Sequence, residues 1–244
     1  MTENDCDEHP AALLPLLRTS AGAVLDTAGP LTETELRAPS SLPGWSRAHV
    51  LTHLARSADS RVRLLTAART GADLPQYPDG ETREREIEEG ARRGADAVRA
   101  DLEDSLRRVL DAIAHHPRDA WDVPVRWLDS GPGPVRDVPG TLLRELEMHH
   151  VDLALGHTPE DWPDRFVAVE TRGVVELLRE ERDVPNMRLR ADEDRVVHSL
   201  GERTGPLVTG PAAALLAWLT GRSDGSGLTV EPPGPLPTVP AWKQ

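Results

Sequence analysis

The chain has 244 residues, a formal net charge of -13 and one cysteine, Cys6. This length allows one large domain or two modest ones. The acidic balance argues against nucleic acid and anionic membranes as partners, and one cysteine excludes an internal disulfide and a cysteine-rich metal site. The chain begins with acidic residues and has no apolar run of about 20 residues, so we expect a cytoplasmic protein with no membrane span. We interpret Cys6 as an inert thiol in a polar tail.

The first part of the sequence has apolar residues at helical spacing. Helices are expected over residues 11–28, 46–70, 81–114 and 141–155, with a short helical turn over 31–36. Ser46 can cap the second helix, and Gly90 and Gly94 can bend the third. The stretch 117–140 is rich in Pro, Gly and Trp and is expected to be irregular. Four helices with one long connection predict a four-helix bundle.

The pattern changes near residue 158. A helix is expected from about residue 160 to 182, and a compact apolar helix over 211–220. Short β-like runs cover 187–189, 195–200, 207–209 and 227–230. The sequence therefore predicts an α+β protein. Residues 1–158 form the four-helix bundle, which we expect to bind metal, and residues 159–244 form a smaller mixed α/β domain.

Two histidine-containing segments are candidates for metal binding. His49 and His53 lie four residues apart, as do Glu145 and His149, so each pair shares a helix face. A carboxylate and an imidazole at this spacing can chelate one ion, and helix bundles build metal sites from such inward side chains. A histidine from the second helix would complete three mixed ligands with a free position, which is typical of catalytic zinc.

Spacing alone leaves alternatives open. A Glu–His pair on a helix surface has the same spacing. His49 and His53 are equal candidates by spacing. The apolar register of Val50 and Leu54 favours His53, and whether His49 joins the site stays open. His150 lies about 100° around the helix from His149, so both do not easily face one ion.

Several segments resemble one family. Residues 42–55, which include Gly44-Trp45 and His53, resemble the N-terminal signature of mycothiol-dependent maleylpyruvate isomerases and their DinB-like relatives. Residues 144–153 resemble the second signature, and 77–94 are also similar. The resemblance implies that His53, Glu145 and His149 hold zinc or another divalent metal. Ser57 departs from the asparagine expected in close relatives.

The resemblance extends to residues 210–222, which look like the C-terminal motif of that family. It implies that Arg222 is catalytic and binds substrate. A guanidinium can clamp a carboxylate, although a helix C-cap is an equal interpretation. Arg83 is a weaker substrate-binding candidate, because its charged surroundings also fit a solvated helix face. Asp152, three residues after His149, is a candidate to orient that imidazole from the second layer around the ion.

The implied activity is the conversion of maleylpyruvate to fumarylpyruvate by thiolate addition, bond rotation and elimination, with mycothiol as the thiol cofactor. The expected partners are therefore a small-molecule substrate and mycothiol, and the expected assembly is a monomer or small homo-oligomer. One alternative is a mycothiol S-transferase acting on another electrophile. A second is a non-catalytic module that binds metal or a hydrophobic ligand.

Overall fold

The structure of the protein is a computed structural model that describes residues 9–128, 130–193, 195–202, 204–240 and 242. Cys6, expected to be an inert thiol, lies outside these ranges. The chain divides into two compact units, Met1–Leu155 and Gly156–Gln244. The division falls three residues before the boundary at 158 that the sequence indicates. None of the helices in the described ranges is long and apolar enough to span a membrane.

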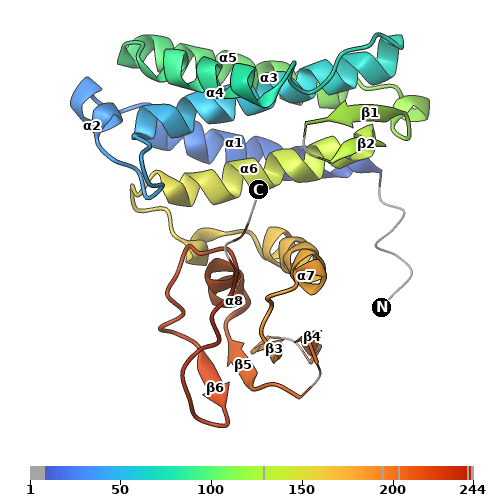
Figure 1. The fold of residues 1–244 in the computed structure, drawn as a ribbon. Coiled ribbons are helices and arrows are strands. Elements are labelled where there is room, and N and C mark those ends of the chain that lie inside the picture. The colour runs from blue at the N-terminus through green and yellow to red at the C-terminus, as the bar shows by residue number, and fades with distance from the viewer. Residues whose placement is uncertain (1–8, 129, 194, 203, 241, 243–244) are drawn as a thin grey trace. The chain divides into compact units, whose positions relative to one another are not determined.

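The N-terminal unit is built on long helices that pack side by side (Figure 1). They are α1 (Leu14–Ala28), α3 (Arg47–Thr70), α5 (Ala95–Ala114) and α6 (Val138–Asp152). α3 packs against α5 and α6, and α1 packs against the same two helices. Leucines from each helix, such as Leu17, Leu54, Leu102 and Leu146, are at most 1% exposed in the shared core. The expected helical bundle is confirmed.

The expected helix 81–114 is two helices, and this prediction was wrong in its continuity. α4 (Gly80–Ala91) ends before Gly94, whose extended backbone begins α5. Arg37, at the end of the short helix α2 (Glu33–Arg37), donates hydrogen bonds to the carbonyls at and just after the end of α4. The extended backbone of Gly94 and the hydrogen bonds of Arg37 together accompany a complete break between α4 and α5. The sequence had predicted only a bend at this point.

The segment 117–140, expected to be irregular, contains an antiparallel hairpin of β1 (Pro124–Trp127) and β2 (Gly131–Pro134). Prolines occupy this ribbon without breaking it, because each strand of a two-stranded sheet has an unpaired edge. The 3-10 turns of this unit are η1 (Pro10–Leu13), η2 (Arg118–Ala120) and η3 (Val135–Asp137). They lead into α1, β1 and α6, and α6 begins three residues earlier than expected.

α4 lies unusually close to α3 at one glycine. A Cβ atom built on Gly90 would stand 2.3 Å from Cγ2 of Thr52. A side chain at residue 90 would require either the Thr52 side chain or one of the two helices to shift. The residue after Thr52 is His53, so this close contact fixes α4 beside the part of α3 that carries a candidate ligand.

The C-terminal unit combines helices α7 (Asp164–Glu180) and α8 (Ala212–Leu219) with a mixed sheet and the 3-10 turn η4 (Pro159–Asp161). The strand order is β4-β3-β5-β6, in which β3 and β5 are parallel and the outer pairs are antiparallel. The strands are β3 (Met187–Ala191), β4 (His198–Leu200), β5 (Leu207–Gly210) and β6 (Thr229–Glu231). The expected α+β class is confirmed.

Candidate metal centre

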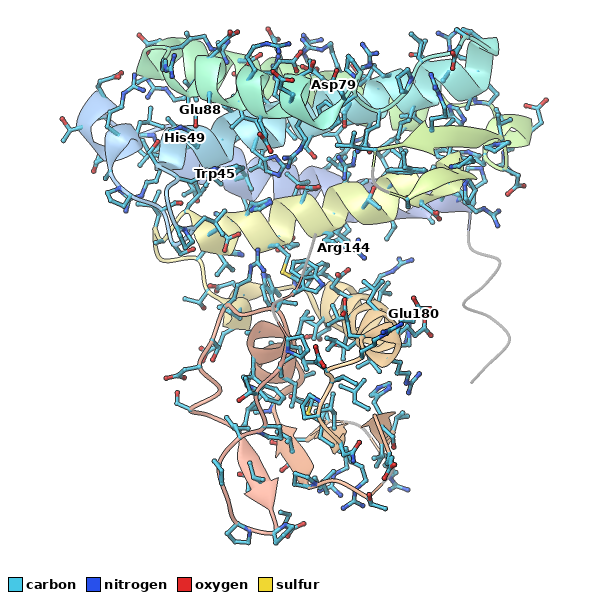
Figure 2. All side chains as sticks on the ribbon, viewed as in Figure 1. Trp45, His49, Asp79, Glu88, Arg144 and Glu180 are labelled. Atoms are coloured by element: carbon cyan, nitrogen blue, oxygen red, sulfur yellow. The ribbon has the colours of Figure 1, made fainter. Side chains whose placement is uncertain are left out.

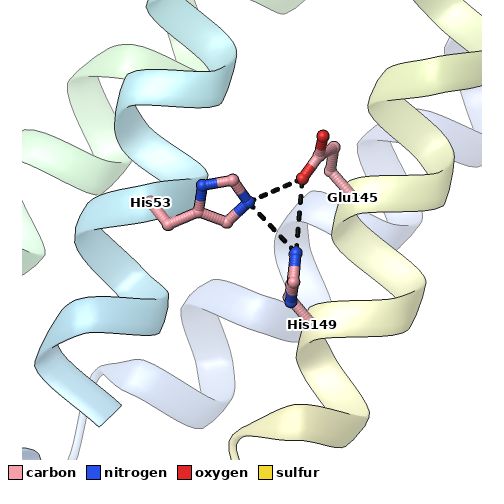
Figure 3. A group of neighbouring side chains, drawn as sticks. All are labelled: His53, Glu145 and His149. Atoms are coloured by element: carbon pink, nitrogen blue, oxygen red, sulfur yellow. Dashed lines mark hydrogen bonds and ion pairs between the residues drawn. The ribbon is translucent and has the colours of Figure 1, made fainter. Parts of the chain in front are cut away.

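The three side chains expected to hold a metal converge between α3 and α6 (Figure 3). Nε2 of His53 lies 2.8 Å from Oε2 of Glu145 and 3.0 Å from Nε2 of His149. The third side of the triangle, from Nε2 of His149 to Oε2 of Glu145, is 3.4 Å. The four-residue spacing on α6 brings Glu145 and His149 to one face, and α3 supplies the remaining nitrogen.

The cluster is largely shielded from water. His53 and His149 are 2% and 3% exposed, and the Glu145 side chain keeps 19% exposure. On its far side, Nδ1 of His149 lies 2.8 Å from Oδ2 of Asp152, which is itself 1% exposed. A carboxylate accepts hydrogen bonds, so Nδ1 carries the proton and the lone pair of Nε2 faces the cluster. Asp152 therefore contacts the imidazole of a candidate ligand, and its role in orienting that imidazole stays a prediction.

The protonation of the cluster follows from burial and close charges. Burial lowers the pKa of His53 to about 4, against the opposing effect of Glu145. Burial alone would raise the pKa of Glu145, but His53, His149 and Arg61 hold it well below its ordinary value. Burial would also lower the pKa of His149, yet its hydrogen bonds to Asp152 and Glu145 raise it. An ionised carboxylate thus faces two imidazoles in a low-dielectric site.

These donors fit a divalent transition metal. Two imidazole nitrogens and one carboxylate oxygen, all within 4.8 Å of one another, match the donor set of open three-ligand zinc sites. The tautomer of His149 fixed by Asp152 already directs a lone pair inward. With three protein donors, such a site leaves positions free for other ligands, as catalytic metal sites do.

Arg83 reaches the cluster from α4. Its guanidinium nitrogen lies 3.3 Å from Nδ1 of His53. Arginine only donates hydrogen bonds, so Nδ1 accepts this bond and Nε2 of neutral His53 donates its proton to Glu145. Arg83 is therefore not a purely solvated surface residue, which was the alternative interpretation, because it contacts His53.

Arg61 was not recognised from the sequence. This arginine is 3% exposed and donates to Oε1 of Glu145 at 3.1 Å. Ser57, where the resemblance led us to expect asparagine, accepts from Arg61 through its side-chain oxygen at 2.5 Å. His53, Ser57 and Arg61 lie four residues apart on α3, and this spacing was the available signal.

The two other histidines near the candidate ligands have different partners. Nδ1 of His49 accepts the Ser46 backbone N–H at 3.2 Å and lies 2.7 Å from its hydroxyl, so His49 closes the capping box of α3. Its other nitrogen lies 3.4 Å from Glu88 of α4, and both residues are labelled in Figure 2. His150 turns toward α1, with Nε2 2.8 Å from Oγ1 of Thr27. Neither histidine belongs to the three-residue cluster.

Two aromatic side chains lie near the cluster. The Trp45 ring lies 5.5 Å from the His53 ring and stacks on His49 at 6.3 Å. Tyr77 is 6% exposed, and burial raises the pKa of its hydroxyl. This tyrosine is a further residue near Arg61, Arg83 and Glu145 that no sequence pattern singled out as functional.

Arg222 belongs to the C-terminal unit, just after α8. Gly221 has a positive φ of 72°, which ends the helix and lets the Arg222 backbone N–H bond the carbonyl of Ala217 at 2.7 Å. Its guanidinium donates to the Thr220 carbonyl at 3.1 Å and lies 5.3 Å from the centre of the Trp242 ring. The helix-end position expected from sequence is therefore observed, and the catalytic role of Arg222 stays a prediction.

The C-terminal unit also contains a pocket of about 640 Å³. It lies among α7, α8 and β3, and residues such as Val167, Leu189 and Leu215 give it apolar walls. Acidic side chains, including Glu160 and Asp164, are also part of its lining. No sequence pattern predicted this pocket.

Comparisons with known proteins agree with this fold. A sequence model described as "Mycothiol maleylpyruvate isomerase N-terminal domain" matches residues 17–154. A solved structure described as mycothiol-dependent maleylpyruvate isomerase is 25% identical, with a TM-score of 0.88, and the match covers 96% of this chain and 97% of the other. A histidine-to-alanine mutant of a mycothiol-dependent maleylpyruvate isomerase is 24% identical, with the same TM-score and coverage, and supports the fold. No curated protein sequence matches the chain. Because the family model covers more than half of the residues, this chain belongs to the mycothiol maleylpyruvate isomerase N-terminal domain family.

Proposed function

We propose that this protein is an enzyme that uses a divalent metal, zinc in our first choice, and mycothiol to convert maleylpyruvate to fumarylpyruvate. The observation that carries the proposal is the buried cluster of His53, Glu145 and His149 in a member of this family. The 25% identical isomerase, matched over nearly the full length of both chains, supports the choice of substrate and thiol.

Under this proposal the three cluster residues hold the ion, and Asp152 keeps His149 in the tautomer that binds it. A divalent metal bound there lowers the pKa of a thiol, so that thiolate is available near neutral pH. The burial of both imidazoles keeps competing water away from the donors, which strengthens electrostatic interactions in the site.

The proposed reaction is a conjugate addition followed by its reversal. The mycothiol sulfur forms a bond to one carbon of the cis double bond, and the electron pair of that double bond moves to the adjacent carbonyl oxygen as an enolate. The former double bond then rotates as a single bond. The enolate re-forms the alkene in the trans arrangement as the carbon–sulfur bond breaks, so the thiolate is recovered.

Positive groups are needed for the enolate oxygen and the substrate carboxylates. Arg83 is the candidate within the N-terminal unit, since its guanidinium lies 3.3 Å from Nδ1 of His53. We assign Arg222 the same kind of role from the C-terminal motif, because a guanidinium can bind a carboxylate through two parallel hydrogen bonds. A neutral substitution of either residue should then raise KM or lower kcat without removing metal.

The deciding experiment follows maleylpyruvate by ultraviolet absorbance with metal-loaded protein, with and without mycothiol. We expect fumarylpyruvate only when mycothiol is present, with no net consumption of thiol. His53→Ala should abolish turnover. His49→Gln is the matched control on the same helix, because glutamine preserves a capping box and His49 is outside the cluster.

The other outcomes separate the alternatives. Metal binding through the cluster without conversion of maleylpyruvate would overturn the substrate assignment. Loss of one thiol for each electrophile consumed would instead identify a mycothiol S-transferase. If no metal binds and no thiol-dependent conversion occurs, the enzyme assignment fails and a non-catalytic binding module becomes the better description.

A further inference from the structure

We propose that Arg61 is a positioning residue for the metal centre, which holds one oxygen of Glu145 so that the carboxylate offers a single oxygen to the ion. This inference rests on the proposed function, because it takes Glu145 as a ligand. Arg61 does not touch the two imidazoles in the described contacts. Its action is therefore on the geometry and charge of Glu145.

The two oxygens of Glu145 have different partners. Oε1 accepts from Arg61 at 3.1 Å, and Oε2 lies 2.8 Å from Nε2 of His53. The second imidazole is also nearer to Oε2, with Nε2 of His149 at 3.4 Å. The carboxylate is thus divided between a guanidinium on one side and the imidazole pair on the other.

Arg61 is itself held in place on several sides. Its NH1 donates to the backbone carbonyl of Ser57 at 3.0 Å and to the Ser57 hydroxyl at 2.5 Å. Its Nε donates to the hydroxyl of Thr141 at 3.2 Å, and Thr141 lies one turn before Glu145 on α6. A planar guanidinium with these fixed partners cannot turn away from Oε1 without losing buried hydrogen bonds.

This arrangement has two consequences for an ion at the cluster. Oε1 is occupied by a donor, so chelation of the ion by both oxygens is disfavoured and coordination positions remain for thiol and substrate. The contacts of Arg61 also hold Glu145 in one orientation, so that Oε2 is already directed at the imidazole pair when the ion arrives. Partners behind the direct ligands tune metal sites in this way.

Ser57 gains a role in this arrangement. Close relatives are expected to carry asparagine there, and serine provides one of the acceptors that fix the Arg61 guanidinium. An asparagine side chain has an acceptor oxygen as well, so Ser57→Asn should retain the function. Ser57→Ala should weaken it.

The test is a titration of purified metal-free protein with cobalt(II), read by visible absorption. Tetrahedral cobalt absorbs more strongly than five- or six-coordinate cobalt, so the spectrum reports coordination directly. We expect Arg61→Gln to weaken cobalt binding about 10- to 100-fold and to lower the band intensity. Arg61→Lys keeps the charge without the planar fork and should show the same change of spectrum with a smaller loss of affinity.

Arg56→Gln is the matched control. Arg56 lies on the same helix and pairs with Asp101 at 2.6 Å, so its loss also breaks a contact between helices, but one that does not involve Glu145. It should retain the wild-type cobalt affinity and spectrum. If the Arg61 variants retain both as well, the positioning role is wrong.

If Arg61→Gln fails to fold, which circular dichroism of the metal-free protein would show, a double variant takes its place in the test. Ser57→Ala with Thr141→Val removes two acceptors of Arg61 and leaves every charge in place. A weaker, altered cobalt site supports the proposal, and a wild-type site overturns it. Wild-type protein that binds no cobalt would overturn the metal centre itself, and this inference with it.

Discussion

Nδ1 of His53 and the guanidinium of Arg83 are 3.3 Å apart, and the guanidinium can only donate in that contact. Neutral His53 therefore carries its proton on Nε2, the nitrogen that faces the cluster. An ion on Nε2 requires the proton to be on Nδ1, where it meets the donors of Arg83. Metal binding and this Arg83 contact are thus opposed, and an ion would release Arg83 to meet a substrate carboxylate.

Arg83→Met should consequently tighten metal binding while it lowers turnover. Without the Arg83 donor, Nδ1 of His53 can carry the proton and Nε2 can bind the ion, so zinc affinity should improve by about 10-fold. In the same variant kcat/KM for maleylpyruvate should fall. Competition titration with a chromophoric chelator measures the first effect. Arg85→Met, an exposed position of α4 whose guanidinium bonds Thr82, is the control. Weaker zinc binding in Arg83→Met would show that the Arg83 contact with His53 does not oppose metal binding.

The metal-free protein should lose stability as the pH falls from about 6.5 toward about 4. Burial lowers the pKa of folded His53 from 6.5 to about 4, so in this interval the unfolded chain binds the extra proton. His149 acts in the opposite sense only above 6.5, because its folded pKa is raised. The His53 contribution is at most about 3 kcal/mol.

Urea unfolding across this pH interval measures that contribution. His53→Gln should flatten the slope of unfolding free energy against pH, whereas the exposed His115→Gln should keep the wild-type slope. An unchanged slope in His53→Gln would show that the folded protein does not exclude the proton from this imidazole.

Metal removal should lower the melting temperature without unfolding the protein. The bundle core is apolar and independent of the cluster, so helical circular dichroism should survive a chelator. Zinc at 100 times its Kd adds about 2.7 kcal/mol, which corresponds to a rise of roughly 5–10 °C for a chain of this size. Differential scanning calorimetry with His149→Ala as control checks this, since that variant should gain little from zinc.

Gly90→Ala should be destabilising even though alanine favours helices. The added methyl would stand 2.3 Å from Cγ2 of Thr52, so the Thr52 side chain or one of the helices must shift, at a cost of about 1–3 kcal/mol. Thr52→Ser removes that methyl group and should recover much of the loss in a double-mutant cycle. Purely additive effects of the two substitutions would refute the close contact.

The helices that carry the site were predictable because their local signals agree. Ser46 begins α3, and the apolar register of Val50 and Leu54 favoured His53. Four-residue spacing likewise paired Glu145 with His149. The strands of the C-terminal unit were found at nearly the expected residues, since β-like runs there are separated by Gly and Pro turns.

What the sequence did not reveal depends on contacts across helices. From the sequence, Arg61 looks like an ordinary arginine on a helix surface. Only its contact with Glu145 on α6 makes it part of the site. His49 occupies the third helical position of the capping box, where Glu or Gln is usual. The sequence therefore did not show that His49 helps Ser46 to cap α3. Hairpin pairing in 124–134 left no alternating pattern, because β2 consists only of glycine and proline.

α6 is held against α1 by polar contacts on a different face from its candidate ligands. Ser20 donates to Glu147, and Thr27 contacts His150, so two side chains on α1 contact two particular residues of α6. A slip of one residue would turn α6 by about 100° and break both contacts. The direction in which Glu145 and His149 project from α6 is therefore fixed when the protein folds. Ion capture should then be limited by dehydration and access of the ion, with little contribution from helix movement.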